Sequence, residues 1–182
     1  MSARQNPVTS DVLMTFDEVR DRLLARLEGM SDAEYLWEPV ADCLTVRVGP
    51  DGAAHADERP HGTSGQAPFA TIAWRAWHIG SDCLRGYARL FGEPPIPPAA
   101  RQLWPATAKA GVAALAEDIA AFRARVAALG DTRLLAPMGP PAAPYDADSF
   151  LALATHAIDE TAHHGAEIAL LRDLHAHGLG GS

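Results

Sequence analysis

Apolar residues recur at three- and four-residue steps through the long stretches without glycine or proline, and this periodicity is typical of amphipathic helices. The pattern predicts a first helix from about Pro7 to Gly29, because proline suits a first helical turn and glycine a C-terminal stop. Ser31 and Glu34 then resemble a capping box that opens a short helix ending before Pro39. The apolar stripe of the first helix consists of Val12, Phe16, Val19, Leu23 and Leu27.

Three more long helices are expected. The second covers about residues 69–91, and the third covers about residues 107–129 and is ended by Gly130. A fourth begins at Asp148-Ser149, either of which can cap it, and continues to about position 176. The apolar positions of the third helix follow the seam pattern of left-handed helix packing. They are Val112, Leu115, Ile119, Phe122, Val126 and Leu129.

Two of the connections between these helices are expected to be long loops. Residues 41–68 hold repeated glycines and prolines, within which residues 45–48 form at most a short strand, and residues 131–145 are rich in proline. Four amphipathic helices without a convincing strand pattern predict an all-α fold, namely a four-helix bundle with long loops after the first and third main helices. We expect a single domain over residues 1–182, with its core at about residues 7–178.

One face of the fourth helix combines polar and apolar residues at a spacing of roughly one turn. Burying unpaired imidazoles and carboxylates is costly, so these polar groups need a partner in the interior toward which their apolar neighbours point them. The polar members of this face are His156, Glu160, His164 and Glu167, and the apolar members are Leu153, Leu171 and Leu174.

Glu160 and His164 lie at positions i and i+4, so their polar ends converge on one point above the helix. Two histidines and one carboxylate with an open position are a known catalytic arrangement for zinc and for non-haem iron. Such a site needs a third ligand from another helix. An internal salt bridge without a metal explains the same pair of residues.

The second helix contains a single histidine, His78. If Ile79 and Cys83 belong to the core, His78 falls roughly 100° away from them, on a flank that it shares with Asp82. That flank is either a solvated polar face or, because tryptophans such as Trp74 lie close by in the sequence, part of the interior. The pattern leaves both interpretations open.

Three segments, taken in order and at their spacing, resemble the DinB-like (DinB/YfiT) superfamily. They are Tyr35–Pro39 after the first helix, Trp74–Ile79 in the second helix and His163–Leu174 in the fourth. The resemblance spans about residues 12–176. It implies a four-helix bundle, in agreement with the periodicity.

The resemblance also implies a divalent metal held by a histidine of the second helix and a histidine pair of the fourth. By position, the ligands are His78, Glu160 and His164, and Glu160 stands where many relatives have histidine, which changes the charge of the site. Characterised relatives include transferases and isomerases that use bacillithiol or mycothiol. This implies a low-molecular-weight thiol cosubstrate, whose pKa a metal would lower.

We therefore expect a divalent-metal-dependent enzyme, with zinc or nickel by ligand type, that acts on a small-molecule substrate. Candidate catalytic residues are Asp82, which can orient His78, and His156 and Glu167, each about one helical turn from the ligands. Two alternatives stay open. One is a non-catalytic bundle that binds a metal or a small ligand, and the other is a dimerising bundle with a metal-free, salt-bridged interior.

Composition narrows the expected partners. The chain has 182 residues, of which 48% are hydrophobic and 21% charged, as in a globular domain. Its net charge is −8 and its basic residues are scattered, which argues against nucleic acid as a partner. Two cysteines are too few for a disulfide framework, and no apolar run is long enough for a membrane span, so we expect a cytoplasmic protein.

Four tryptophans make a homodimer plausible, although they can equally cover the bundle beneath its loops.

Overall fold

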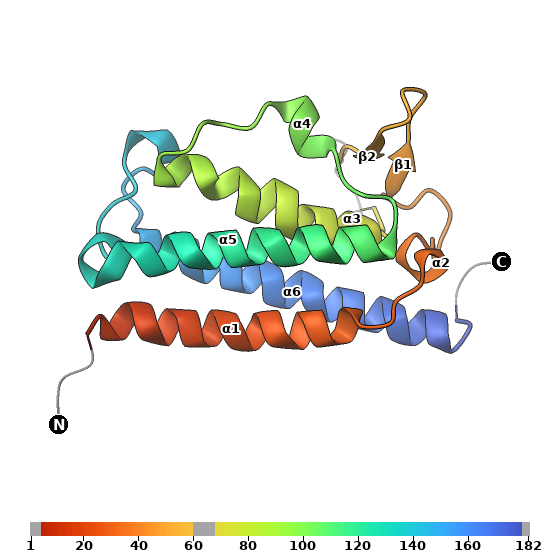
Figure 1. The fold of residues 1–182 in the computed structure, drawn as a ribbon, viewed down its shortest axis with the longest axis horizontal. Coiled ribbons are helices and arrows are strands. Elements are labelled where there is room, and N and C mark those ends of the chain that lie inside the picture. Colours follow the sequence, from red (N-terminus) through yellow and green to blue (C-terminus); the bar gives the residue numbers. More distant parts are fainter. Residues whose placement is uncertain (1–4, 60–67, 180–182) are drawn as a thin grey trace.

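The computed structural model describes residues 5–59 and 68–179. Four long helical segments lie side by side as a bundle (Figure 1). They are α1 (Pro7–Leu27), the consecutive helices α3 (Ile72–Trp77), η1 (His78–Arg85) and η2 (Gly86–Phe91), α5 (Ala108–Leu134) and α6 (Phe150–Ala176). α1 packs against α5 and α6, and η1 packs against the same two helices. The all-α fold expected from the periodicity is confirmed.

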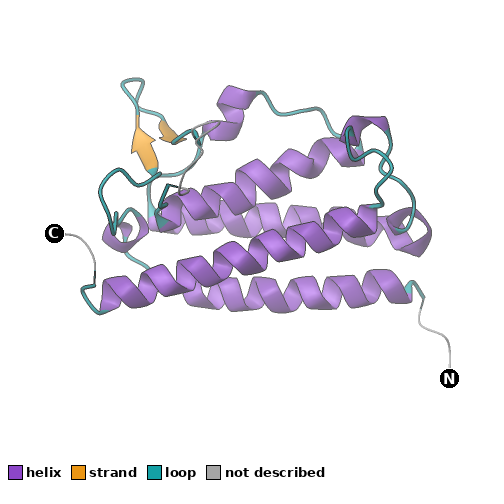
Figure 2. Ribbon diagram, turned by 180° about the vertical axis from the view of Figure 1, so that it is seen from behind, coloured by secondary structure: helices purple, strands orange, loops and turns teal. Residues whose placement is uncertain are grey.

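Shorter elements occupy the connections. They are α2 (Asp32–Tyr35), the strands β1 (Val46–Val48) and β2 (Ala54–Ala56), α4 (Pro98–Gln102) and the 3-10 turn η3 (Pro140–Ala142). β1 and β2 pair in antiparallel register and form a small hairpin at one end of the bundle (Figure 2). The sequence allowed a short strand at residues 45–48 but did not indicate the second strand, because the three residues Ala54–Ala56 are too few for their alternation to distinguish a strand from a loop.

The core contains most of the expected apolar stripes. In α1, Val12 is only partly buried, whereas the rest of its stripe is buried: Phe16, Val19, Leu23 and Leu27. Of the predicted stripe in α5, Val112 and Leu129 are only partly buried, whereas the remaining four are buried: Leu115, Ile119, Phe122 and Val126. These two helices therefore meet along the surfaces that their periodicity predicts.

Side-chain caps fix the beginnings of three helices. Ser31 accepts a hydrogen bond from the backbone N–H of Glu34, and Ser149 accepts one from that of Ala152. Both caps confirm the sequence-based expectation. Thr71 caps α3 in the same way, through the backbone N–H of Trp74.

The second helical segment differs from its prediction in two respects. It begins at Ile72 rather than at residue 69, because Ala70 forms a β-bridge with Leu44 and Thr71 takes the capping position. It is also not one uniform helix, since six α-helical residues are followed by the π-helical η1 and the 3-10 helix η2. A π-helical turn shifts the register of the side chains relative to an ideal α-helix.

Two glycines shape the surroundings of η1 and the end of α5. An added Cβ at Gly80 would lie 2.8 Å from Trp104, which precedes α5, and 2.9 Å from Asp118 of α5, so glycine permits η1 to pack closely against both. Gly130 has φ of 62° and breaks the regular helix where the sequence predicted its end, but helical structure resumes and α5 continues to Leu134.

Within the two described ranges, no helix combines the length and the apolar character needed to cross a bilayer. Trp74, Trp77 and Trp104 are buried inside this one chain, so they give no support to a homodimer, which stays a prediction.

Candidate metal centre

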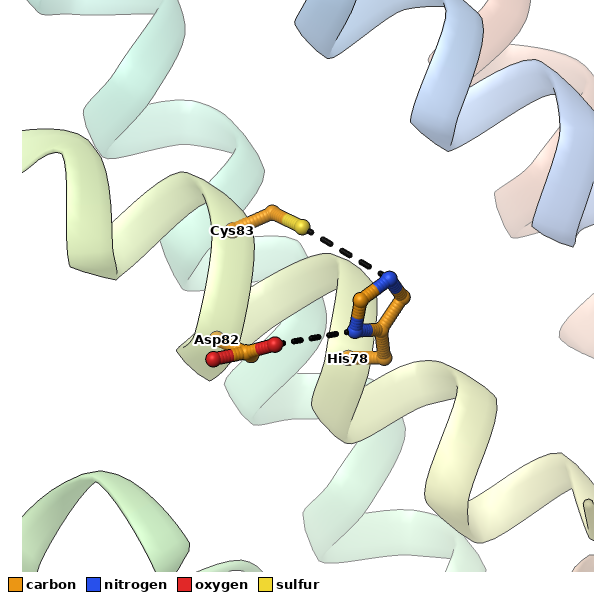
Figure 3. A group of neighbouring side chains, drawn as sticks. All are labelled: His78, Asp82 and Cys83. Carbon is orange, nitrogen blue, oxygen red and sulfur yellow. Dashed lines mark hydrogen bonds and ion pairs between the residues drawn. The ribbon is translucent and has the colours of Figure 1, made fainter. Parts of the chain in front are cut away.

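The π-helical segment η1 brings three side chains with metal-binding chemistry to one side of the helix. Its hydrogen bonds join residues five positions apart, so Asp82 and Cys83 both lie one turn after His78. Figure 3 shows the imidazole of His78 between the carboxylate of Asp82 and the sulfur of Cys83. An ideal α-helix would place Cys83 about 140° away from His78.

The imidazoles of His78 and His164 meet at the carboxylate of Glu160. The Nε2 atom of His78 lies 3.2 Å from Glu160 Oε2, and that of His164 lies 3.3 Å from the same oxygen. The two rings are 4.8 Å apart and nearly perpendicular. We call His78, Glu160 and His164 the donor cluster, since one ligand atom from each lies within 4.8 Å of the others.

The other nitrogen of each ring faces a carboxylate of its own. The Nδ1 atom of His78 lies 3.0 Å from Asp82 Oδ2, and that of His164 lies 2.6 Å from Glu167 Oε2. A carboxylate can only accept, so in the neutral tautomer with the proton on Nδ1 each ring donates to its own carboxylate, Asp82 or Glu167. When a ring is neutral, its Nε2 then presents a lone pair to the centre of the cluster.

Further contacts hold the two rings in place. The indole of Trp74 stacks on the imidazole of His78, with the ring centres 5.3 Å apart and the planes 10° apart. The guanidinium of Arg75 pairs with Glu167 and lies 3.3 Å from Nδ1 of His164. Arg75 therefore balances the charge of the carboxylate that orients His164.

The pKa values of His78 and His164 are shifted in opposite directions. Burial lowers the pKa of His78, but Asp82 and Cys83 outweigh this effect and raise it to about 10. Burial lowers the pKa of His164, and the nearby charge of His78 lowers it further. Without a cation, a proton on His78 can therefore hold the cluster together beside Glu160.

A cleft of about 550 Å³ opens onto the donor cluster. Besides the cluster it is lined by Arg59, Asp82, Cys83, Tyr87, His156, Asp159 and His163. A side pocket of about 490 Å³ adjoins it, because Tyr87 and His156 line both. The side pocket is mostly apolar, with Leu90, Met138, Ala142 and Leu153 among its residues.

The sequence-based candidates fall into two groups. His78, Glu160, His164, Asp82 and Glu167 come together as described above. The expectation that His156 faces the interior is wrong: its side chain is 52% exposed, at the edge of the cleft. The buried stripe of α6 runs instead through Ala157, Thr161, His164 and Ile168, so His156 lies on the flank of that stripe.

The sequence interpretation gave no role to Cys83 or Arg75. Cys83 is buried, as its place in the apolar stripe predicted, but the sequence carries no clear signal for the π-helical turn that brings its sulfur close to His78. Arg75 contacts residues 89 and 92 positions further along the chain. A contact of this range requires the packing of α3 against α6, which local pattern does not give.

The donor cluster fits a divalent cation by its chemistry. Imidazole nitrogen and carboxylate oxygen are common ligands of zinc and nickel, and a carboxylate behind the distal nitrogen is typical of metal-binding histidines. Within the described ranges, every ion pair found for Glu160 is with a histidine: His78, His156 and His164. A cation among these atoms would replace the proton that otherwise has to join them.

The fold and the cluster together define a four-helix-bundle protein with a candidate metal centre. Comparison with protein families matches residues 15–168 to the DinB superfamily. The match covers well over half of the chain, so the chain belongs to this superfamily, as the sequence motifs indicated. No curated protein and no solved structure matches it.

Proposed function

We propose that this chain is a divalent-metal-dependent enzyme in which His78, Glu160 and His164 hold the ion, with zinc or nickel favoured by the ligand types. One observation carries the proposal: both Nε2 atoms lie within 3.3 Å of the same carboxylate oxygen, while each Nδ1 has a separate carboxylate. A bound divalent cation acts as a Lewis acid and lowers the pKa of a thiol or water that coordinates it.

The proposed reaction is transfer or isomerisation of a small molecule with a bacillithiol- or mycothiol-type thiol as cosubstrate. Membership of the DinB superfamily and the two adjoining cavities support this choice. The polar cleft suits the hydrophilic thiol, and the mostly apolar side pocket suits an electrophile with an apolar group. Burial raises the pKa of Tyr87, which lines both cavities, so its hydroxyl stays protonated and can donate to the substrate.

Three further residues have proposed roles. Asp82 and Glu167 hold the Nδ1 protons of His78 and His164, and so fix the direction of each Nε2. His156 stands at the edge of both cavities, where its exposed side chain can contact a bound substrate.

The test has two stages. Elemental analysis of the purified full-length chain should find about one divalent ion per chain, and His164→Ala should lose it while the neighbouring His163→Ala keeps it. Consumption of thiol and of small electrophiles is then followed for the wild type and for the triple variant His78→Ala, Glu160→Ala, His164→Ala.

Loss of turnover in the triple variant supports an enzyme. Metal binding without turnover of any thiol–electrophile pair would favour a non-catalytic metal-binding bundle. If the wild type binds no divalent ion, the salt-bridged, metal-free interior is the correct description.

A further inference from the structure

Cys83 places a sulfur atom beside the donor cluster. Its Sγ lies 3.8 Å from Nε2 of His78 and 4.0 Å from Oε2 of Glu160. The side chain is buried, yet it lines the cleft that opens onto the cluster. The sulfur therefore faces Nε2 of His78 and Oε2 of Glu160, two atoms that the proposed function makes ligands of the ion.

We propose that Cys83 Sγ is a fourth ligand of the bound cation, so that the chain supplies a Cys–His–His–Glu site. This inference rests on the proposed function, because it requires an ion between His78, Glu160 and His164. As the metal–sulfur bond forms, the thiol proton passes to solvent, and the thiolate is the ligand.

The separations around Nε2 of His78 and Oε2 of Glu160 are close to those of tetrahedral coordination. Zinc–nitrogen and zinc–oxygen bonds of about 2.0–2.1 Å separate two such ligands by about 3.4 Å, and a zinc–sulfur bond of about 2.3 Å puts sulfur about 3.6 Å from nitrogen. In the structure the nitrogen–oxygen separations are 3.2 and 3.3 Å, and the sulfur–nitrogen separation is 3.8 Å. Relative to Nε2 of His78 and Oε2 of Glu160, from which Sγ lies 3.8 and 4.0 Å, the sulfur needs to approach by a few tenths of an ångström.

The π-helical turn is what builds this arrangement. With residues five positions apart stacked on adjacent turns, Asp82 takes the Nδ1 side of His78 and Cys83 takes the Nε2 side (Figure 3). Asp82 fixes the ring so that the ligand nitrogen and the sulfur point into the same space. One short segment would thereby supply two ligands and the carboxylate that orients one of them.

A thiolate ligand narrows the choice of metal ion. Soft sulfur ligands favour zinc over harder ions such as manganese, and zinc can expand from four to five ligands during a reaction. An external thiol would then reach the ion from the cleft as an additional ligand or displace Cys83.

The chain contains a matched control. Cys43 is also a buried free cysteine, but its Sγ donates to the carbonyl oxygen of Val40 at 3.0 Å and it belongs to no group of metal-binding side chains in the described residues. Cys43→Ser therefore repeats the chemical change of Cys83→Ser away from the cluster.

The experiment is cobalt substitution of the full-length, metal-free chain. One equivalent of Co²⁺ should give visible d–d absorption and, in addition, an intense thiolate-to-cobalt charge-transfer band in the near ultraviolet. Cys83→Ser should lose the charge-transfer band but keep weaker d–d absorption, and Cys43→Ser should keep both. Zinc affinity, measured by competition with a chelating dye, should fall at least about tenfold in Cys83→Ser.

The outcomes separate this inference from the proposed function. Stoichiometric cobalt binding without a charge-transfer band in the wild type would overturn the role of Cys83 and leave the three-ligand site intact. The absence of any cobalt binding would overturn both. Because the decisive band is recorded on the wild type, the result does not depend on whether the Cys83 variant folds.

Discussion

The π-helical segment η1 carries two polar clusters that satisfy their groups in opposite ways. Toward α5, the guanidinium of Arg85 donates two hydrogen bonds to the carboxylate of Asp118, at 2.8 and 2.7 Å. Toward α6, His78 meets Glu160 and His164. The first cluster pairs opposite charges, whereas the second gathers atoms that bear lone pairs.

The comparison shows what distinguishes a structural cluster from a candidate binding site. Asp118 is only 7% exposed, but its two oxygens have matching N–H donors, so the pair is complete within the chain. In the donor cluster the atoms that face one another are all potential acceptors once the rings are neutral. They need either an added proton or an added cation.

The largest expected effect concerns metal-dependent stability. Zinc at about 100 times its dissociation constant should stabilise the wild type by about 2.7 kcal/mol, because only the folded chain assembles the cluster. Thermal unfolding with and without zinc should show this gain, and His164→Ala should lose it completely. If the gain persists in His164→Ala but disappears in His163→Ala, the metal binds on the outer side of α6 instead of at the donor cluster.

The ion pair of Arg85 and Asp118 should contribute to stability without contributing to zinc binding. Asp118→Asn leaves Arg85 without its charged partner and should lower the free energy of unfolding by about 2 kcal/mol, since Arg85 is about one third exposed and water screens part of the loss. Denaturant unfolding of the metal-free protein measures this. Zinc affinity should not change, and a large loss of affinity would show that the two sides of η1 are coupled.

The fold was largely readable from the sequence. The boundaries of α1 and α6 follow from apolar stripes, a first-turn proline and the Ser149 cap, all of which are local signals. The pair Glu160 and His164 was readable for the same reason, because four residues on an α-helix define a direction.

The second helix marks where that reasoning ends. A constant α-helical period predicted the burial of Cys83 correctly but left the side of His78 undecided. It gave no sign of the π-helical turn that brings both residues to one face. The turn is stabilised by packing against α5, including the close approach at Gly80, and no local pattern encodes such packing. The contacts of Arg75 and Arg85 across the bundle are likewise tertiary.

A smaller effect is expected at the carboxylate that orients His78. Asp82→Asn keeps the shape but accepts the Nδ1 proton less strongly, so zinc affinity should fall about 10- to 100-fold. Isothermal titration against a competing chelator measures the change. Asp159→Asn, at an exposed aspartate of the same cleft, is the control and should leave affinity unchanged. Equal losses in both variants would indicate a general effect of cleft charge.

The last expected effect is the pH dependence of the metal-free protein. Burial alone would lower the pKa of His78, but Asp82 and Cys83 outweigh burial and raise this pKa from 6.5 to about 10. The protonated form of His78 therefore stabilises the folded state. This contribution is fully present below pH 6.5 and is lost as the pH rises toward about 10. The midpoint of thermal unfolding should therefore fall over that range in the wild type, and by less in His78→Gln.

Zinc should reverse the direction of this dependence, because the ion requires the deprotonated ring that alkaline pH supplies. Zinc-bound protein should thus gain stability relative to the metal-free form as the pH rises from 6.5. The hydrogen bonds between Arg85 and Asp118 involve no proposed zinc ligand, so zinc should not change their contribution to stability. A wild-type profile that zinc leaves unchanged in slope would mean that the proton on His78 and the ion do not compete for the same nitrogen.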